Sequence, residues 1–545
     1  MMDEGSEMDD NADDVMEDDD DAHNLTHDGG DTPFDELPLL EQFADESLEL
    51  IIKKYGGDTL EMSLISLPRT IRLMSACSGS GCFELATHAA LCEINRRFKR
   101  FRMENQDTDP FHFKVSTSFL CEIVPNKQKF LLEHVIKHQV ETEEETPCLF
   151  ENIINLNDGE TRRCIVHSAA CELDRFDPKK GDADDLSIFA AGFSCKSFSK
   201  MNINFTELRT ALADQKECSS LATFRGVLHI VRECRPRIVL LENVDSIDSS
   251  VGQSDSSDKE AKSNLQVVLT QISELGYSCR AEKLKASEYG VPQRRTRYYF
   301  VCVRQNGGSA LSEPADLLVE RIMDRVLSLR RECRHNPDYF LLPDSHGLVQ
   351  IELNRRVSKK KDGEAKDKAA WPEQHSALAE KYGVQWPLQP SKELASSVWY
   401  DVLPDREKEV LCFVNIMNER ITNVDDKIQY VDISQSATRL PTSTRGSQVT
   451  PTILPGSKLW HVGRKRLLLG TELMALQGLP MTEFPENILT TLSQKQCADL
   501  AGNMFAVPCV MAVVMSALST LRFETYSEEE ELDAVASSMQ KWCKS

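Results

Sequence analysis

Between residues 67 and 304, apolar runs alternate with segments of helical periodicity, and this alternation limits the possible folds more than any other feature. The predicted strands are TIRLMSAC, KVSTSFLCEIV, DLSIFAAGF, RIVLLENV and RYYFVCV. The predicted helices are CFELATHAALCEINRRF, PNKQKFLLEHVIKH, LATFRGVLHIVREC and NLQVVLTQISELGY. Strands that alternate with helices form a mostly parallel sheet covered on both faces. The sequence therefore predicts an α/β fold that binds ligands beyond the carboxyl ends of its strands.

The remainder of the 545 residues, a length that accommodates about two to four domains, does not keep this rhythm. Residues 305–460 are rich in Pro, Lys and Asp and are expected to be largely irregular. Their segment RRVSKKKDGEAKDK is expected to be a charged loop, either a solvated insertion or a patch for nuclear import or phosphate contact. Helical pattern returns at 461–522 in RLLLGTELMALQG and FAVPCVMAVVMSALSTL, and residues 523–545 form an acidic amphipathic tail.

The formal net charge of −24 does not exclude a nucleic-acid partner, because the acidic residues are unevenly distributed. Residues 1–50 hold 20 Asp and Glu and no Lys or Arg, which leaves −4 for the rest of the chain. Such a composition cannot bury enough apolar surface to fold, so residues 1–45 are predicted to be a disordered acidic tail. The tail is either simply solvated or an internal mimic of a polyanion that shields a basic cleft.

The 17 cysteines are irregularly spaced and include no C-x-x-C pair. This pattern predicts neither a zinc ribbon nor a thioredoxin-type site, and no metal is expected. An odd, scattered set of cysteines in a long chain is typical of a reduced, intracellular protein. We expect no membrane partner, because no run of about 18 apolar residues occurs and the acidic N-terminus does not resemble a secretory signal.

A glycine turn and an acidic residue together indicate a cofactor site. In SACSGSGCFE, a strand ends, Gly79 and Gly81 permit a tight turn, and a helix begins whose N-terminus favours a carboxylate or phosphate. Glu122 ends the next strand, where nucleotide-binding α/β units place an acceptor for ribose hydroxyls. Alone, each feature is an ordinary strand end; together they predict an adenosine-containing cofactor.

Three further features could supply chemistry. Cys195 follows the apolar run in FAAGFSCKSFSK, either as a small buried side chain or as a reactive thiol. Glu242 follows an apolar strand, so its pKa is expected to be raised unless it is merely salt-bridged. Alternation places Arg295 and Arg297 on one face before the next strand, where guanidinium groups suit a carbonyl oxygen or phosphate.

The order of these pieces is more specific than any one of them. Glycine turn, strand-end Glu, strand-end Cys, ENV, QRRTR, a long insertion, ELMALQGLP and AGNMFAVP resemble the motif series of the C5-cytosine methyltransferases. The resemblance covers about residues 70–304 and 430–522. It implies a Rossmann-like, mixed but mostly parallel sheet in a catalytic domain at 67–304. It further implies a smaller irregular target-recognition region at 305–460 and a return to the catalytic domain at 461–522.

The resemblance also implies a cofactor, S-adenosylmethionine, and a substrate, duplex DNA with the target cytosine flipped out, in the nucleus. Cys195 would be the nucleophile, Glu242 would bind and protonate N3, and Arg295 would hold O2 with Arg297 in support. The implied cofactor-binding residues are Ser78, Gly79, Ser80, Gly81, Cys82, Phe83, Glu122, Ile123, Asn152, Ile153, Gly192, Asn503 and Met504. The implied substrate-binding residues are Ser194, Lys196, Ser199, Asn243 and Gln293.

The sequence departs from the family pattern at three places. Ser194-Cys195-Lys196 replaces Pro-Cys-Gln, and Lys196 is expected to lower the pKa of Cys195 or to contact a phosphate. Ser75 and Asn152 stand where the family has aspartates near the cofactor. Two alternatives therefore remain: a tRNA-acting enzyme, although its Pro-Pro-Cys-Gln and Cys-Phe-Thr signatures are missing, and a regulatory member with weak or no catalysis.

Overall fold

The computed structural model describes most of the chain between the two acidic tails. The described residues are 40–105, 112–137, 146–157, 162–173, 185–199, 205–208, 210–249, 262–305, 311–362, 371–440, 449–484 and 488–523. The predicted tails, up to residue 39 and from residue 524, lie outside these ranges. Residues 40–45 correct the predicted tail boundary, because they form the start of helix α1 (Leu40–Tyr55), whose Phe43 and Ala44 are buried.

The centre of the molecule is a nine-stranded mixed sheet in the order β5-β4-β3-β2-β1-β6-β7-β9-β8. Its strands are β1 (Thr70–Ala76), β2 (Lys114–Cys121), β3 (Cys148–Phe150), β4 (Arg163–Cys164), β5 (Ala169–Ala170), β6 (Asp185–Ala191), β7 (Ile238–Val244), β8 (Tyr277–Lys285) and β9 (Thr296–Arg304). The five consecutive strands from β3 to β7 in this order are parallel, whereas β9 runs antiparallel to β7. The predicted α/β class with a mostly parallel sheet is confirmed.

The sheet reverses its direction of growth beside β1. The chain builds β2 and β3 on one side of β1 and then crosses to place β6 and β7 on the other. In open α/β sheets such a reversal leaves a crevice at the carboxyl ends of the strands, where ligands bind. Because β9 is antiparallel, its amino end lies at this same edge of the sheet. One edge therefore collects residues from six elements that are distant in the sequence.

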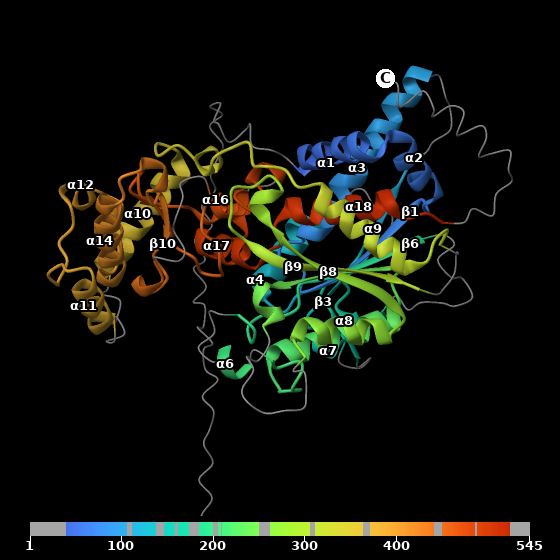
Figure 1. Cartoon of the computed structure of the whole chain (residues 1–545), viewed down its shortest axis with the longest axis horizontal. Coiled ribbons are helices and arrows are strands. Elements are labelled where there is room, and N and C mark those ends of the chain that lie inside the picture. The colour runs from blue at the N-terminus through green and yellow to red at the C-terminus, as the bar shows by residue number, and fades with distance from the viewer. Residues whose placement is uncertain are drawn as a thin grey trace, which may run out of the picture.

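Helices cover both faces of the sheet, as Figure 1 shows. One face carries α1, α2 (Gly57–Ser66), α3 (Cys82–Asn105), α9 (Ala315–Ser328) and α18 (Val507–Thr520). The other carries α7 (Ser219–Cys234) and α8 (Asn264–Glu274). Between β2 and β3, α4 (Pro125–Phe130) continues into a π-helical turn at Leu131–Ile136. Every residue of α18 is buried, so this late segment completes the core of the sheet domain.

The described residues between 329 and 469 build a second lobe beside the sheet domain, seen at the left of Figure 1. Its helices are α10 (Gly347–Asp362), α11 (Trp371–Lys381), α12 (Lys392–Ala395), α13 (Val398–Asp401) and α14 (Asp405–Arg420). Its small antiparallel sheet is β10 (Tyr430–Asp432), β11 (Leu459–His461) and β12 (Arg466–Leu467). The chain then returns through α16 (Gly470–Ala475) and α17 (Gln494–Asn503) to α18.

Two expectations for residues 305–460 are wrong. The region is largely helical rather than irregular, because amphipathic segments such as α9 and α14 bury one face. The expected charged loop is helical up to Asp362, where α10 ends. There the buried Glu352 carboxylate accepts hydrogen bonds from Arg355 and Arg356, each 2.7 Å away. These two arginines of the charged segment therefore help to hold α10 together.

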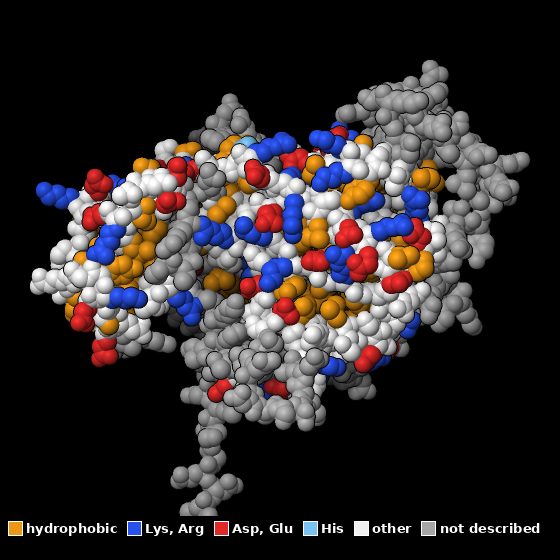
Figure 2. All heavy atoms as spheres, viewed as in Figure 1, with side chains coloured by type: hydrophobic (Ala, Val, Ile, Leu, Met, Phe, Trp, Pro, Cys, Tyr) orange, Lys and Arg blue, Asp and Glu red, His pale blue; other side chains and the backbone are white. Residues whose placement is uncertain are grey.

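Among the described residues, no single helix has the length and hydropathy needed to cross a membrane. Within that same part of the chain, α17 and α18 reach the required length and composition only when they are taken together, across a bend of 41°. The face of the molecule drawn in Figure 2 intersperses basic, acidic and apolar side chains, so its described surface carries no continuous field of one sign.

Candidate active site

The glycine turn after β1 is held against the end of β2. Gly79 and Gly81 have φ of 56° and 62°, a left-handed conformation that favours glycine. The Ser78 amide donates to the Cys121 carbonyl at 3.1 Å, and Gly79 N donates to Glu122 Oε2 at 2.9 Å. A Cβ on Gly81 would come within 2.7 Å of Val135. The turn is therefore preformed, and Glu122 fixes its shape.

Two exposed isoleucines lie at the ends of the neighbouring strands. Ile123, directly after Glu122, is 61% exposed, and Ile154, just beyond β3, is 44% exposed. Large aliphatic side chains this exposed at the ligand edge of a sheet suit the faces of a planar base. Ile153, the predicted contact, is instead buried against Gly226 of α7. The Asn152 side chain accepts a hydrogen bond from Ile154 N at 3.0 Å, which shapes this loop.

The last part of the predicted cofactor site comes from the segment after α17. Phe505 packs so closely on Gly192, at the end of β6, that a Cβ there would lie 2.7 Å from its ring. The Cys82 thiol lies 3.6 Å from the Phe505 carbonyl. Met504 is buried, whereas Asn503 is exposed and donates to the Asp499 carbonyl at 2.9 Å. The structure thus brings the glycine turn after β1 close to the segment around Gly502 and Asn503, called the GN segment below.

Cys195 lies in a short turn after β6 that several hydroxyl groups hold in place. Its carbonyl accepts hydrogen bonds from Phe198 N and Ser199 N, both at 3.0 Å. From α7, Thr223 Oγ1 accepts from the Ser194 amide at 3.1 Å, and Ser220 Oγ accepts from the Ser197 amide at 3.2 Å. These contacts hold the turn in one conformation, a role that the family's proline would have at the position of Ser194.

The carboxyl end of β7 supports this turn. The Asn243 side chain is fully buried and donates to the Phe193 carbonyl at 3.0 Å. Ser246 Oγ donates to the Phe198 carbonyl at 2.6 Å. Asn243 therefore ties the strand that carries Glu242 to the loop that carries Cys195, rather than pointing at a substrate.

Glu242 and Arg297 form the polar centre of the site. Arg297 Nε lies 3.3 Å from Glu242 Oε1, and Arg295 Nη2 lies 3.9 Å from the same atom. Burial raises the pKa of Glu242, and the two arginines oppose that rise. Burial likewise raises the pKa of the Cys195 thiol, with Arg297 the strongest opposing charge and Glu242 reinforcing the rise. All four predicted catalytic residues thus lie within electrostatic reach of one another.

The Arg295 side chain is hydrogen-bonded to the backbone of distant segments. Its Nη1 donates to the carbonyls of Ile453 and Gly502, both at 3.1 Å, and burial lowers its pKa to about 10. A Cβ on Gly502 would overlap the backbone of Leu454 and Pro455. Arg295 therefore joins the start of β9 to the returning chain. The guanidinium nearest to Glu242 is that of Arg297.

Gln293 is fully buried, and neither its amide oxygen nor its amide nitrogen has a hydrogen-bond partner among the described residues. Its backbone pairs with Thr450, which anchors it beside the second lobe. Buried amides without partners are rare. Gln293 is thus a buried polar side chain at the junction of the two lobes.

Sequence reasoning missed three residues of this edge and one cluster beside it. Ile154 carries no motif of its own but adjoins the predicted Ile153, and Phe505 lies within the quoted AGNMFAVP segment, next to the predicted Met504. Glu84, in the first turn of α3, is buried, and burial raises its pKa to about 7. The cluster is Cys148, Cys164, His167 and Cys171, at the β3–β5 edge. Its signal in the sequence is the spacing in CIVHSAAC.

Known proteins match this chain across the sheet domain. A protein-family model described as "C-5 cytosine-specific DNA methylase" matches residues 163–518. The DNA (cytosine-5-)-methyltransferase DMT5 of Cryptococcus neoformans is 26% identical over 468 residues, which cover 83% of this chain and 17% of that protein. Type II methyltransferase M.HhaI of Haemophilus parahaemolyticus is 33% identical over 22% of this chain and 32% of its own. Type II methyltransferase M.NlaIV of Neisseria lactamica is 24% identical over 385 residues, which cover 63% of this chain and 85% of that protein.

The chain spans about a sixth of the length of the fungal relative and a third of the length of M.HhaI. The family model covers well over half of the residues, from the β4 strand to the last turns of α18. That range contains Cys195, Glu242, Arg297 and the GN segment, whereas the glycine turn and Glu122 of the predicted motif series lie outside it. The chain belongs to the C-5 cytosine-specific DNA methylase family.

Proposed function

We propose that this chain transfers a methyl group from S-adenosylmethionine, the methyl donor of its family, to C5 of a cytosine in DNA. The observation that carries the proposal is the meeting of Cys195, Glu242 and Arg297 at one sheet edge. A thiol, a carboxyl of raised pKa and a guanidinium are the three groups that addition to a pyrimidine ring requires.

The preformed turn fits an adenosine cofactor. The Ser80 hydroxyl is buried without a hydrogen-bond partner among the described residues, and Glu122 keeps unused lone pairs on both carboxylate oxygens. Glu122 would accept hydrogen bonds from ribose hydroxyls, and Ile123 and Ile154 would flank the adenine. When bound, S-adenosylmethionine supplies an electrophilic methyl group.

The chain's own groups account for the proton and electron movements. The Cys195 sulfur, as thiolate, bonds to C6 of the flipped cytosine, while Glu242 donates a proton to N3 and so neutralises the ring. C5 then carries the electron pair that takes up the methyl group, and the pair of the broken S–CH3 bond would stay on the sulfur of the departing S-adenosylhomocysteine. Removal of the C5 proton by a base re-forms the double bond, the C6–S bond breaks, and N3 returns its proton to Glu242. The thiolate is regenerated.

Arg297, rather than Arg295, is our candidate for the group that holds O2 of the base. Its Nε lies 0.6 Å closer to Glu242 Oε1 than Arg295 Nη2 does, at 3.3 against 3.9 Å. Arg295 Nη1 already donates hydrogen bonds to two backbone carbonyls. Its role would be to position the returning chain, so that its loss would act on folding as well as on turnover.

DNA is favoured over RNA as substrate by the chain's membership of a DNA methylase family and by its similarity to a DNA (cytosine-5-)-methyltransferase. We place the enzyme in the nucleus on the strength of its proposed substrate. The second lobe would contact the DNA around the target, because its Ile453 carbonyl accepts a hydrogen bond from Arg295, which places this lobe beside the catalytic residues. Lys196, exposed beside the nucleophile, would contact a phosphate.

The test is methyl transfer from labelled S-adenosylmethionine to unmethylated duplex DNA, hemimethylated duplex DNA and bulk tRNA in parallel. We expect label on DNA that disappears in a Cys195→Ser variant. Label on tRNA alone would replace the proposal with the RNA-acting alternative. Binding of the cofactor with no label on any substrate would favour the regulatory alternative. The ratio of the two duplexes distinguishes maintenance from de novo preference.

A further inference from the structure

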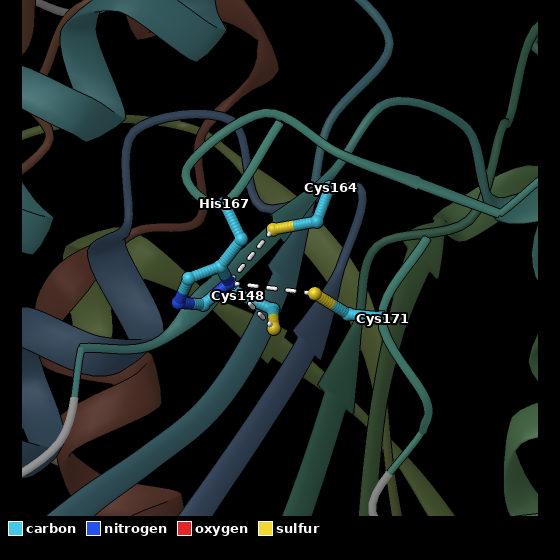
Figure 3. Close-up of side chains that lie close together, drawn as sticks. All are labelled: Cys148, Cys164, His167 and Cys171. Carbon is cyan, nitrogen blue, oxygen red and sulfur yellow. Dashed lines mark hydrogen bonds between the residues drawn. The ribbon is translucent and has the colours of Figure 1, made fainter. Parts of the chain in front are cut away.

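Four potential metal ligands converge at the edge of the sheet, away from the catalytic residues. They are Cys148 at the start of β3, Cys164 in β4, His167 in the following turn and Cys171 just after β5. Their three sulfurs and one ring nitrogen all lie within 4.8 Å of one another. Figure 3 shows the four side chains pointing toward one another, with His167 Nδ1 facing all three sulfurs.

The distances match those within a tetrahedral metal site. His167 Nδ1 lies 3.5, 3.3 and 3.4 Å from the sulfurs of Cys148, Cys164 and Cys171. Zinc bonds of about 2.3 Å to sulfur and about 2.0 Å to nitrogen place two tetrahedral ligands about 3.5 Å apart. The observed contacts therefore leave room for one ion at the centre of the four atoms.

Hydrogen bonding does not explain this arrangement. The Nδ1 atom of an imidazole carries one proton at most, so it can donate to one of the three sulfurs and not to all of them. A disulfide does not explain it either, because Cys148, Cys164 and Cys171 are all free and a disulfide would use only two of them. Three sulfurs equidistant from one nitrogen are the pattern of ligands around a shared cation.

We infer that Cys148, Cys164, His167 and Cys171 bind one structural zinc ion. Thiolate and imidazole ligands select zinc over magnesium or calcium. Four protein ligands fill a tetrahedral shell, so no position remains for a reacting water, and the site is structural rather than catalytic. The spacing Cys164-x2-His167-x3-Cys171 resembles the short intervals of closed zinc sites, and the fourth ligand arrives from the neighbouring strand.

The local fold explains why a metal would be needed here. Strands β4 and β5 are two residues long each, and β5 is exposed. So short a hairpin at a sheet edge is not stable by itself. Three of the ligands come from this hairpin and the fourth from β3, so the ion would fasten the hairpin to the main sheet. Ile165 N, which donates to the Leu149 carbonyl at 2.8 Å, is a neighbouring backbone link.

The zinc would also support the cofactor edge, a consequence that rests on the proposed function. β3 runs from the ligand Cys148 directly into the loop that carries Asn152 and Ile154. Glu151 N donates to the Arg163 carbonyl at 3.4 Å, so the metal-bound hairpin and the cofactor loop share a backbone contact. Loss of the ion should therefore weaken binding of the cofactor product, S-adenosylhomocysteine, about tenfold.

The first test is the metal content of the full chain, measured by plasma mass spectrometry after expression with added zinc. We expect about one zinc per chain in the native protein and in Cys92→Ser, an exposed cysteine on α3 that serves as the matched control. A His167→Ala variant changes an exposed residue and should fold, yet should lose most of the zinc. A His167→Cys variant should keep it, because a fourth thiolate completes the shell.

A second measurement needs no variant. Replacement of the ion by cobalt should give the intense visible bands of tetrahedral coordination together with thiolate-to-cobalt charge transfer. Native protein that holds no zinc and takes up no cobalt would overturn the site, as would iron in place of zinc or full zinc retention in His167→Ala. These readouts do not depend on methyl transfer, so the zinc site and the proposed function can fail separately.

Discussion

Arg297 Nε lies 3.3 Å from Glu242 Oε1, and the same guanidinium is the strongest charge that opposes the raised pKa of the Cys195 thiol. One arginine thus acts on both the carboxyl group and the nucleophile. The pairing follows from the antiparallel β9, which places Arg297 opposite Val244, two residues beyond Glu242. The chemistry of the site therefore depends on a strand whose direction differs from that of its neighbour.

Removal of the Arg297 charge should make Cys195 less reactive. In Arg297→Ala the pKa of the thiol rises further, because the strongest charge that opposes the effect of burial is gone. The thiolate fraction at pH 8 therefore falls, and only the thiolate is nucleophilic. We expect alkylation of Cys195 by iodoacetamide, mapped by peptide mass spectrometry, to slow severalfold. Alkylation at the native rate would contradict the electrostatic role.

Lys196 should act on DNA rather than on the thiol. Its side chain is exposed, and the charges that act most strongly on Cys195 are those of Arg297, Glu242 and Arg295. Lys196→Gln should weaken DNA binding and reduce the slope of log K against log salt by about one. Lys53→Gln, an exposed lysine on α1, is the control and should leave the slope unchanged. Slower alkylation of Cys195 in Lys196→Gln would restore the first role that the sequence suggested.

Gly502 should tolerate no side chain. A Cβ there would overlap the backbone of Leu454 and Pro455, next to the carbonyls that Arg295 binds. We expect Gly502→Ala to lower the free energy of unfolding by about 2 to 4 kcal/mol, measured in urea. Gly347→Ala is the matched control, because no atom lies within 4 Å of the added carbon, and should change it by about 0.5 kcal/mol at most. Equal stability of the two variants would show that the returning chain packs differently.

Glu84 should make stability fall as pH rises. Burial raises its pKa from 4.5 to about 7 in the folded chain, so between these values the unfolded chain releases a proton that the folded chain keeps. The free energy of unfolding is therefore highest, as far as this group affects it, below pH 4.5, and it falls as the pH rises to about 7. Glu84→Gln should therefore be more stable than the native chain at pH 8, by on the order of 3 kcal/mol at most, with no such advantage at pH 4.5. Urea unfolding at both pH values tests this, and a pH-independent difference would refute it.

The strands that carry the chemistry were predictable because they are buried on both faces and end in recognisable turns. The apolar stretches of β1 and β6 end just before the glycine turn and the Cys195 turn, and β7 carries Glu242 directly after four buried apolar residues. β8 escaped prediction because most of its residues are only half buried and its polar and apolar positions mix. β4 and β5 are too short to show any period.

Contacts between segments that are distant in the chain could not be predicted from the sequence. The motif order brought Arg295 and Arg297 to the site together, but only the structure separates Arg297, beside Glu242, from Arg295, bound to Ile453 and Gly502. The metal cluster was missed because Cys148 lies 16 positions before Cys164, and a pattern of paired cysteines has no place for His167. Register across strands, rather than spacing along the chain, determines both arrangements.

The proposed mechanism depends above all on a bond between Cys195 and C6 of a cytosine in DNA. The direct measurement is covalent capture with duplex DNA that contains 5-fluorocytosine, in the presence of S-adenosylmethionine. The fluorine cannot leave C5 as a proton does, so the adduct persists after methyl transfer. We expect a stable protein–DNA complex that requires the cofactor, maps to the Cys195 peptide and is missing in Cys195→Ser. An adduct on another cysteine, or methylated DNA without any adduct, would contradict the mechanism.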